Sequence, residues 1–219
     1  MVLVIGDVLA REEVAALREA AEDIPFEDGR ATAGRYARDV KSNLQARPCR
    51  DLEALLATVR EKLLANEVFR SAARPRGFAR MLLSRYRTGM EYGFHIDDAI
   101  MSGSRTDLSF TLPLSDIAEY EGGGLVIADG VEDRVFRPGA GDMILYPTSA
   151  LHRVEPVSSG ERLAVVGWIT SWVRDPARRE ILHDLDAAAR GIFEYIGKSA
   201  DFDRLLKAKS NLERLWAGD

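Results

Sequence analysis

The sequence has 219 residues, 46% of them hydrophobic, with a formal net charge of −5. This length and apolar content suit one domain with a buried core. The acidic balance, without any block of Lys or Arg, argues against nucleic acid or an anionic membrane as a partner. A single cysteine, Cys49, excludes an intramolecular disulfide framework. Because the apolar N-terminal run is short and has no basic flank, we expect a cytoplasmic protein and not a secreted or membrane-spanning one.

The N-terminal region, about residues 1–75, predicts helices. A short strand is expected at Val2–Ile5, followed by a helix from about Ala10 to Ala21 with an apolar stripe. The polar, glycine-rich stretch 28–34 is typical of a loop. A second helix is predicted at Arg50–Ala65, where leucines recur at helical spacing.

Residues 77–175 have a different pattern. Short alternating or apolar runs, such as LSFTLPLS, GDMILYP and RLAVVGWITSWV, are separated by turn residues. This pattern is typical of an antiparallel sandwich or barrel. The expected fold class is therefore α+β: a jelly-roll core at about 77–175, preceded by the helical region of residues 1–75, together forming one domain, 1–175.

The C-terminal extension, 176–219, returns to helical periodicity in two amphipathic segments. The expected apolar stripes are Ile181, Leu182, Leu185 and Ala189 in the first, and Phe202, Leu205, Leu206, Leu212 and Leu215 in the second. These stripes are too small to support independent folding. We expect them to pack on the outer face of the barrel or on a second subunit, and both alternatives stay open.

Three metal-capable side chains stand in the β region. In the stretch YGFHIDD (residues 92–98), His95 and Asp97 are spaced i, i+2, so a strand would turn both to one face. His152 opens a strand after the stretch GDMILYP (residues 141–147). A jelly roll brings distant strands side by side, so the three residues can converge on one ion. Two imidazoles and one carboxylate form the facial triad of non-heme Fe(II) oxygenases, with three coordination positions open.

Arg162 lies in the apolar strand GERLAVVGW (residues 160–168) and shares one face with Ala164, Val166 and Trp168. A buried guanidinium is costly unless an anion pairs with it. A dicarboxylate cosubstrate would provide such an anion through a bidentate pair. The alternative is an ion pair with a glutamate such as Glu155.

The set His95-x-Asp97…His152…Arg162 resembles the motif of Fe(II)/2-oxoglutarate dioxygenases of the prolyl-4-hydroxylase-like branch. Further stretches are similar to bacterial PKHD-type hydroxylases: DGRATAG (28–34), KSNLQ (41–45), RYRTGMEYGFHID (85–97), YEGG (120–123), GDMILYP (141–147) and VGW (166–168). The resemblance implies a double-stranded β-helix core, and Fe(II), 2-oxoglutarate and O2 as reactants. It implies succinate and CO2 as products, puts L-ascorbate among the candidate ligands, and carries an association with iron uptake.

By the same resemblance, His95, Asp97 and His152 bind iron, and Arg162 binds the C5 carboxylate of 2-oxoglutarate. Tyr86 either packs in the core or donates its hydroxyl to that carboxylate. The sequence departs from its relatives at Gly124, where an acidic residue is usual, and at Ala150. Both are expected to flank the pocket and to affect substrate choice.

Other side chains have simpler interpretations. Tyr92 and Trp168 are expected in the core, and His183 is expected to be structural. Arg105 and Asp107 are candidate substrate contacts at a strand edge.

The predicted function is hydroxylation of an unactivated C–H bond in a small molecule or peptidyl residue. The expected partners exclude nucleic acid and membrane, and the C-terminal helices are a candidate homo-oligomer interface. Two rival functions are a non-catalytic iron and 2-oxoglutarate sensor, and a cupin-like metalloenzyme that does not use 2-oxoglutarate. The intact triad argues against the sensor, and Arg162 argues against the cupin-like enzyme.

Overall fold

The computed structural model describes residues 1–32 and 34–218, and its strands form two facing antiparallel sheets and a small hairpin. The larger sheet runs β1-β13-β9-β15-β5-β4-β2, with β10 paired to β15. Its strands are β1 Leu3–Ile5, β2 Phe26–Asp28, β4 Leu44–Ala46, β5 Pro75–Arg87, β9 Leu108–Pro113, β10 Tyr120–Gly122, β13 Met143–Pro147 and β15 Val157–Ser171.

The smaller sheet runs β12-β11-β14-β6-β3 and contributes the metal-capable histidines. Its strands are β3 Lys41–Ser42, β6 Glu91–His95, β11 Leu125–Ala128, β12 Asp133–Phe136 and β14 His152–Val154; the hairpin pairs β7 Ile100–Met101 with β8 Ser104–Arg105. The predicted α+β class, with an antiparallel sandwich between N-terminal and C-terminal helices, is confirmed.

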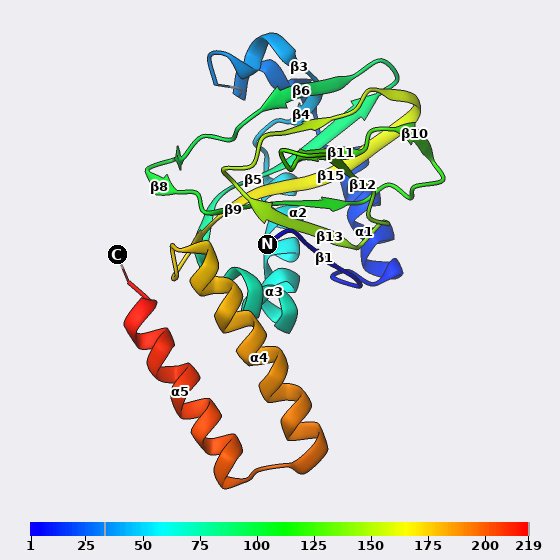
Figure 1. Cartoon of the computed structure of the whole chain (residues 1–219). Coiled ribbons are helices and arrows are strands. Elements are labelled where there is room, and N and C mark those ends of the chain that lie inside the picture. The colour runs from blue at the N-terminus through cyan, green and yellow to red at the C-terminus, as the bar shows by residue number, and fades with distance from the viewer. Residues whose placement is uncertain (33, 219) are drawn as a thin grey trace.

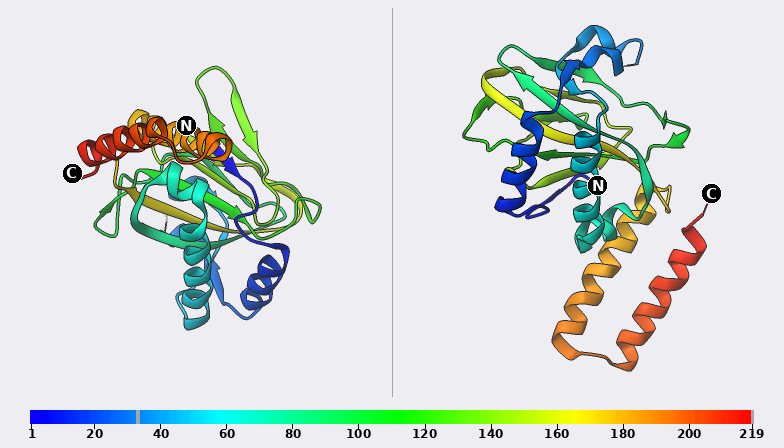
Figure 2. Two further views of the ribbon diagram at one scale, coloured as in Figure 1. Left: turned by 90° about the horizontal axis from the view of Figure 1, so that it is seen from below. Right: turned by 180° about the vertical axis from the view of Figure 1, so that it is seen from behind.

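Three helices, α1 (Arg11–Glu22), α2 (Arg50–Ala65) and α3 (Glu67–Ala73), lie against one side of the larger sheet (Figures 1 and 2). Their buried apolar residues, among them Val14, Leu17, Leu52, Val59 and Phe69, join one hydrophobic core with the sheet. The helix predicted at Arg50–Ala65 has those bounds, and α3 was not predicted. The expected loop 28–34 contains the short 3-10 helix η1 (Gly29–Thr32), and its Ala33 lies outside the described residues. A second 3-10 helix, η2 (Ala37–Val40), follows the loop.

Strand alternation gives the larger sheet two buried faces of different chemistry. The helix-covered face carries residues such as Leu83, Phe110, Leu145 and Val165. The opposite face looks toward the smaller sheet and carries polar groups such as Ser84, Tyr86, Ser109, Thr111 and Arg162 among its apolar side chains. Successive side chains of one strand point to opposite faces, so β5, β9 and β15 each supply both surfaces. The polar inner face is where the candidate site lies.

The C-terminal helices α4 (Pro176–Ile196) and α5 (Ala200–Trp216) form a hairpin that projects beyond the sandwich, with α4 beside α3 (Figures 1 and 2). Asp175 accepts a hydrogen bond from the backbone N–H of Arg178, which caps α4, and Ser199 caps α5 in the same way through Phe202. Pro176 stands at the first turn of α4, where its missing N–H is tolerated.

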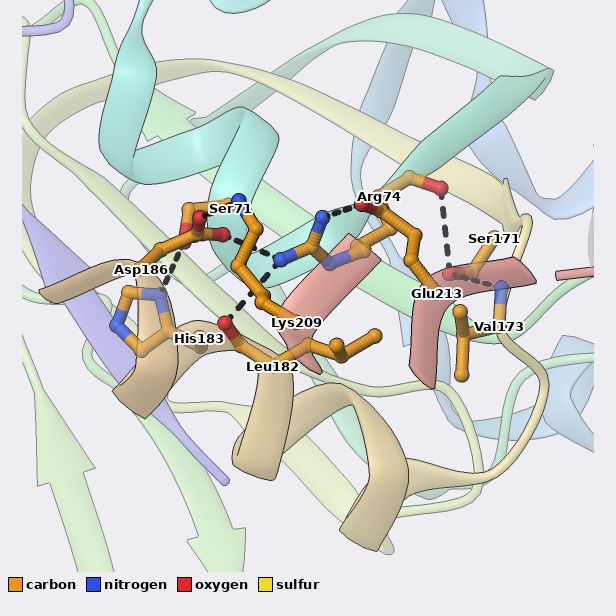
Figure 3. Close-up of polar contacts among 9 residues, drawn as sticks. All are labelled: Ser71, Arg74, Ser171, Val173, Leu182, His183, Asp186, Lys209 and Glu213. Carbon is orange, nitrogen blue, oxygen red and sulfur yellow. Dashed lines mark hydrogen bonds and ion pairs between the residues drawn. The ribbon is translucent and has the colours of Figure 1, made fainter. Parts of the chain in front are cut away.

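A polar cluster joins this hairpin to α3, and we call its members Ser71, Arg74, Asp186, Lys209 and Glu213 the tail anchor (Figure 3). The guanidinium of Arg74 pairs with Asp186 of α4 and Glu213 of α5. Lys209 pairs with Asp186, and the hydroxyl of Ser71 donates to the same carboxylate at 3.0 Å. Two helices that are distant from α3 in sequence are thereby attached to it.

The predicted apolar stripes of the extension are partly wrong. Leu182, Ala189 and Phe202 are buried, but Ile181 and Leu215 are exposed. Arg179 is buried instead, and its guanidinium donates to the carbonyls of Val173 and Arg174 at the end of the sandwich. Helical spacing alone did not reveal that this arginine would find carbonyl acceptors. Among the described residues, no helix is both long and apolar enough to cross a bilayer.

Candidate metal centre

His95, Asp97 and His152 meet between the two sheets, as the sequence predicted. β6 ends at His95 and β14 begins at His152, and the two residues are direct partners in the antiparallel register. The Nε2 atom of His95 lies 3.7 Å from Oδ1 of Asp97, and Nε2 of His152 lies 3.8 Å from Oδ2. One ligand atom from each residue lies within 4.8 Å of the others. This arrangement suits a single ion bound by two imidazoles and one carboxylate.

Backbone carbonyls orient both imidazoles. Nδ1 of His95 lies 2.8 Å from the carbonyl oxygen of Gly93, and Nδ1 of His152 lies 2.9 Å from that of Ala150. A carbonyl oxygen only accepts hydrogen bonds, so each Nδ1 carries the proton and each Nε2 keeps a lone pair for a metal. Burial, and then the neighbouring His152, lowers the pKa of His95 to about 4, which keeps its ring neutral.

Ser109 of β9 holds the carboxylate, a role that sequence reasoning missed. Its hydroxyl donates to Oδ2 of Asp97 at 2.8 Å and lies 3.2 Å from the hydroxyl of Thr148. Partners of this kind fix the orientation of a ligating carboxylate. The available signal was the alternation in Leu108–Pro113, where Ser109 and Thr111 interrupt a strand that is buried throughout.

Aromatic rings pack on the two histidines. Tyr92 stacks on His95 with ring centroids 3.6 Å apart and planes inclined by 12°. Tyr146 meets His152 edge to face at 5.1 Å. Tyr92 lines the cavity beside the triad and also packs against the hydrophobic cluster of Tyr86 and Tyr146, so its expected place in the core is confirmed in part. Trp168 lines the same cavity and belongs to neither hydrophobic cluster of the described residues, so its expected place in the core was wrong. Alternation assigns a residue to a face of the sheet, but it does not reveal whether that face meets packed side chains or a cavity.

Arg162 extends from β15 into the same cavity, and its side chain is almost fully buried, with 3% of its surface exposed. It makes no ion pair and no side-chain hydrogen bond with any residue in the described ranges of the chain. The alternative partner Glu155 pairs with Arg153 instead, at 3.5 Å. Tyr86 is the cross-strand partner of Arg162, and the guanidinium carbon stands 5.4 Å from its ring centroid. A buried cation without a counter-ion, open to a cavity, suits an anionic ligand.

The secondary candidates lie elsewhere. Arg105 and Asp107 bind each other, with Nε 2.8 Å from Oδ1, and neither lines the cavity of the triad. His183 lies 2.9 Å from the hydroxyl of Ser71 beside the tail anchor, consistent with its structural interpretation.

Gly124 and Ala150, the two expected departures from the relatives, do not line the cavity either. A Cβ atom at position 124 would stand 2.8 Å from Oε2 of Glu155 and 2.7 Å from Val135, so Glu155 occupies the space of a side chain there.

Comparison with known proteins gives the family. Residues 81–170 match the model of the 2OG-Fe(II) oxygenase superfamily. The chain is 47% identical to a PKHD-type hydroxylase of Maricaulis maris over 219 residues, covering 100% of both chains. A PKHD-type hydroxylase of Synechococcus elongatus is 45% identical, with 99% of this chain and 100% of that one covered. The chain belongs to the PKHD-type hydroxylases. It is therefore a 2-oxoglutarate-dependent Fe(II) hydroxylase with an H-x-D…H iron-binding triad.

Solved structures share the fold of this PKHD-type hydroxylase at low sequence identity. A Pseudomonas putida prolyl-4-hydroxylase aligns with a TM-score of 0.54 and 23% identity, covering 78% of this chain and 92% of that one. HygX from Streptomyces hygroscopicus, solved with nickel and 2-oxoglutarate bound, aligns with a TM-score of 0.59 and 15% identity over 78% and 84%. The predicted double-stranded β-helix, the Fe(II) and 2-oxoglutarate requirement and the oxidoreductase class are confirmed.

Proposed function

We propose that His95 and His152, through Nε2, and Asp97, through its carboxylate, are the iron ligands of this hydroxylase. Arg162 and Tyr86 hold the far carboxylate of 2-oxoglutarate. The observation that carries the proposal is the burial of Arg162 without a counter-ion in the cavity that also receives the three ligand atoms. Iron with 2-oxoglutarate and O2 supplies the oxidation of a C–H bond, with release of succinate and CO2.

The side chains around the ion bind and orient. Arg162 presents a planar set of donors that suits a carboxylate in a bidentate pair. Burial raises the pKa of Tyr86, against the opposing charge of Arg162, so its hydroxyl stays protonated and can donate a hydrogen bond. Gly93 and Ala150 hold the tautomers, and Ser109 holds Asp97. These groups supply a preformed site before any ligand arrives.

The substrate we propose is a small molecule or a peptidyl residue, and not a nucleic acid, because the chain is acidic and has no basic run. We place the protein in the cytoplasm on the sequence grounds given above.

We propose further that 1–175 and 176–219 fold as one unit, supported by the tail anchor between α3 and the C-terminal hairpin. Exposed Phe193 and Ile196 on that hairpin make it the candidate homo-oligomer surface.

The iron assignment is tested by anaerobic loading with Fe(II), followed by metal analysis and by the weak visible band of the Fe(II)–2-oxoglutarate complex. Asp97→Ala and His152→Ala are each expected to abolish stoichiometric iron binding while the melting temperature is kept. His183→Ala removes the remaining histidine, outside the cavity, and serves as the matched control with full iron content. Iron content like that of the wild type in Asp97→Ala or His152→Ala would reject the assignment.

A further inference from the structure

Two further cations line the cavity of the metal centre, and neither is used by iron or by the proposed 2-oxoglutarate site. Lys41 of β3 is 5% exposed, and Arg80 lies on β5. The ammonium group of Lys41 donates to the hydroxyl of Thr32 at 3.2 Å and stands 5.0 Å from the ring centroid of Tyr92. Within residues 1–32 and 34–218, neither cation has a carboxylate partner.

The strand register separates these cations from the 2-oxoglutarate end of the cavity. Arg162 is paired with Tyr86 across β15 and β5, whereas Trp168 is paired with Arg80 at the other end of the same face. Arg162 and Trp168 are six positions apart, roughly 20 Å along a strand. Trp168 is also the cross-strand partner of Ser109, which holds the iron ligand Asp97. Arg80 therefore belongs to the metal end of the cavity, away from the backbone position of Arg162.

Within the described residues, Lys41 and Arg80 have no ion-paired anion at this end of the cavity. Fe(II) and 2-oxoglutarate carry equal and opposite charges, and Asp97 offsets Arg162. The remaining carboxylates are Asp98, exposed at the cavity wall, and Asp28, whose charge acts on Lys41 from outside the cavity lining; among the described residues neither forms an ion pair with Lys41 or Arg80. Burial, and next the charge of Arg80, lowers the pKa of Lys41 to about 8, so the two cations are close enough to repel. An anionic group between them would relieve both the repulsion and the desolvation.

A neutral donor lies in the wall of the same cavity, on the cross-strand partner of Arg80. The indole Nε1–H of Trp168 is buried and has no hydrogen-bond partner among the described residues. Buried donors of this kind are normally satisfied, so this N–H is available to an acceptor that enters the cavity. Thr32, which accepts a hydrogen bond from Lys41, and Gln45, which accepts one from Thr32, add polar surface to the same cavity.

We propose that Lys41 and Arg80, assisted by the indole N–H of Trp168, bind a carboxylate group of the substrate and so orient the substrate beside the iron. The inference rests on the proposed function and adds that the hydroxylated molecule is an acid. The competing interpretation is that Lys41 only supports Tyr92, which stacks on His95. If Lys41 only supports Tyr92, substitution of Lys41 should affect iron binding and leave carboxylate recognition unchanged.

The experiment compares two small probes, N-acetylglycine and its neutral analogue N-acetylglycinamide, on the anaerobic Fe(II)–2-oxoglutarate enzyme by calorimetry. The acid should bind and the amide should not. Lys41→Met, Arg80→Met and the double variant should each weaken binding of the acid at least tenfold. Lys41→Arg, which keeps the positive charge, should bind the acid like the wild type. Arg76→Met is the matched control, because Arg76 lies on the same strand but stacks over Trp172 outside the cavity. It should bind the acid like the wild type.

Equal binding of acid and amide, or unchanged binding of the acid in the double variant, would overturn the inference. Loss of the iron–2-oxoglutarate band on addition of the acid would also overturn it, since the acid would then occupy the cosubstrate site. If the wild type forms no such band, the proposed function fails separately. The acid is then titrated into the metal-free chain, where weaker binding in the double variant, which keeps Arg162, still supports the carboxylate site and unchanged binding rejects it.

Discussion

The tail anchor and the cavity cations Lys41, Arg80 and Arg162 are two clusters of charge away from bulk water, and they differ in how the charges are paired. In the tail anchor, Arg74 and Lys209 both find carboxylates from neighbouring helices. In the cavity, the three cations have no carboxylate partner among the residues that the structure describes, although Lys41 and Arg162 are more buried than Asp186 or Lys209.

The difference separates structural charge from charge held ready for a ligand. A paired network removes the penalty of burial within the folded chain, so its members act together in stability. An unpaired buried cation keeps that penalty until an anion arrives, so it lowers the stability of the free protein and raises affinity for the anion. The comparison therefore predicts opposite consequences for similar substitutions at the two places.

The largest effect is expected for Arg162→Leu. Truncating one partner of a buried charge pair should weaken 2-oxoglutarate binding by about 2–4 kcal/mol. The variant should unfold at the same or a higher temperature without ligand, because an unpaired buried charge has been removed. Anaerobic titration of 2-oxoglutarate and thermal melts measure the two quantities. Unchanged 2-oxoglutarate affinity would make this arginine purely structural.

Arg74→Met should have the opposite profile. It leaves the carboxylates of Asp186 and Glu213 without their guanidinium, and should lower the free energy of unfolding by about 2–3 kcal/mol, less than for a fully enclosed pair because Glu213 is partly exposed. Affinity for 2-oxoglutarate should stay within twofold of the wild type. Denaturant unfolding and 2-oxoglutarate titration test this. A loss of cosubstrate affinity matching that of Arg162→Leu would remove the distinction between the clusters.

A double-mutant cycle sharpens the comparison. Asp186→Leu alone should destabilise, but in the Arg74→Met background it should cost less, with a coupling energy of about 1–2 kcal/mol. The matched cycle of Arg162→Leu with Glu155→Leu should show no coupling, because Glu155 pairs with Arg153 and not with Arg162. Denaturant unfolding of the single and double variants beside the wild type yields both values. Additive effects at the tail anchor would mean that the Arg74–Asp186 pair contributes nothing measurable.

The smallest expected effect is a pH dependence from Asp186. Burial alone would raise its pKa, but Lys209, Arg74 and Ser71 outweigh that effect and hold the pKa below its usual value of 3.8. The folded-state pKa is depressed, so the stabilisation is fully present above that value and is lost as the pH falls through the folded pKa. The stability difference between wild type and Asp186→Asn should thus shrink in strong acid. A difference that does not change between neutral pH and strong acid would contradict the assignment.

Much of this could be predicted from periodicity and spacing. The apolar spacing of Arg50–Ala65 gave α2 its bounds, and the i, i+2 pair with a distant strand-opening histidine gave the metal cluster. Both signals are local, or need only the general rule that sheets join distant strands. The seven-residue helix α3 was missed because two turns of helix between Asn66 and Pro75 carry too little periodicity to recognise.

The rest depended on tertiary contacts that a single sequence does not contain. Trp168 was assigned to the core, yet the face of the strand that it occupies encloses a cavity. Arg179 replaced Ile181 on the buried side of α4 because two carbonyls just beyond the end of β15 lie within its reach. The Ser109 contact to Asp97 joins two segments whose proximity in the fold is not readable from their spacing.

The two backbone carbonyls that accept hydrogen bonds from the histidine Nδ1–H groups affect which substitutions the positions beside the metal centre tolerate. Every amino acid offers a backbone carbonyl, so the proton position of His152 does not depend on which side chain stands at position 150. Ala150 can therefore be replaced by other residues without loss of the hydrogen bond to the imidazole of His152. Position 93 has no such freedom, since a Cβ atom would come within 2.8 Å of Val40. His152 therefore tolerates substitution of the residue whose carbonyl supports it, Ala150. His95 depends on a glycine at position 93, because Val40 leaves no room there for a Cβ atom.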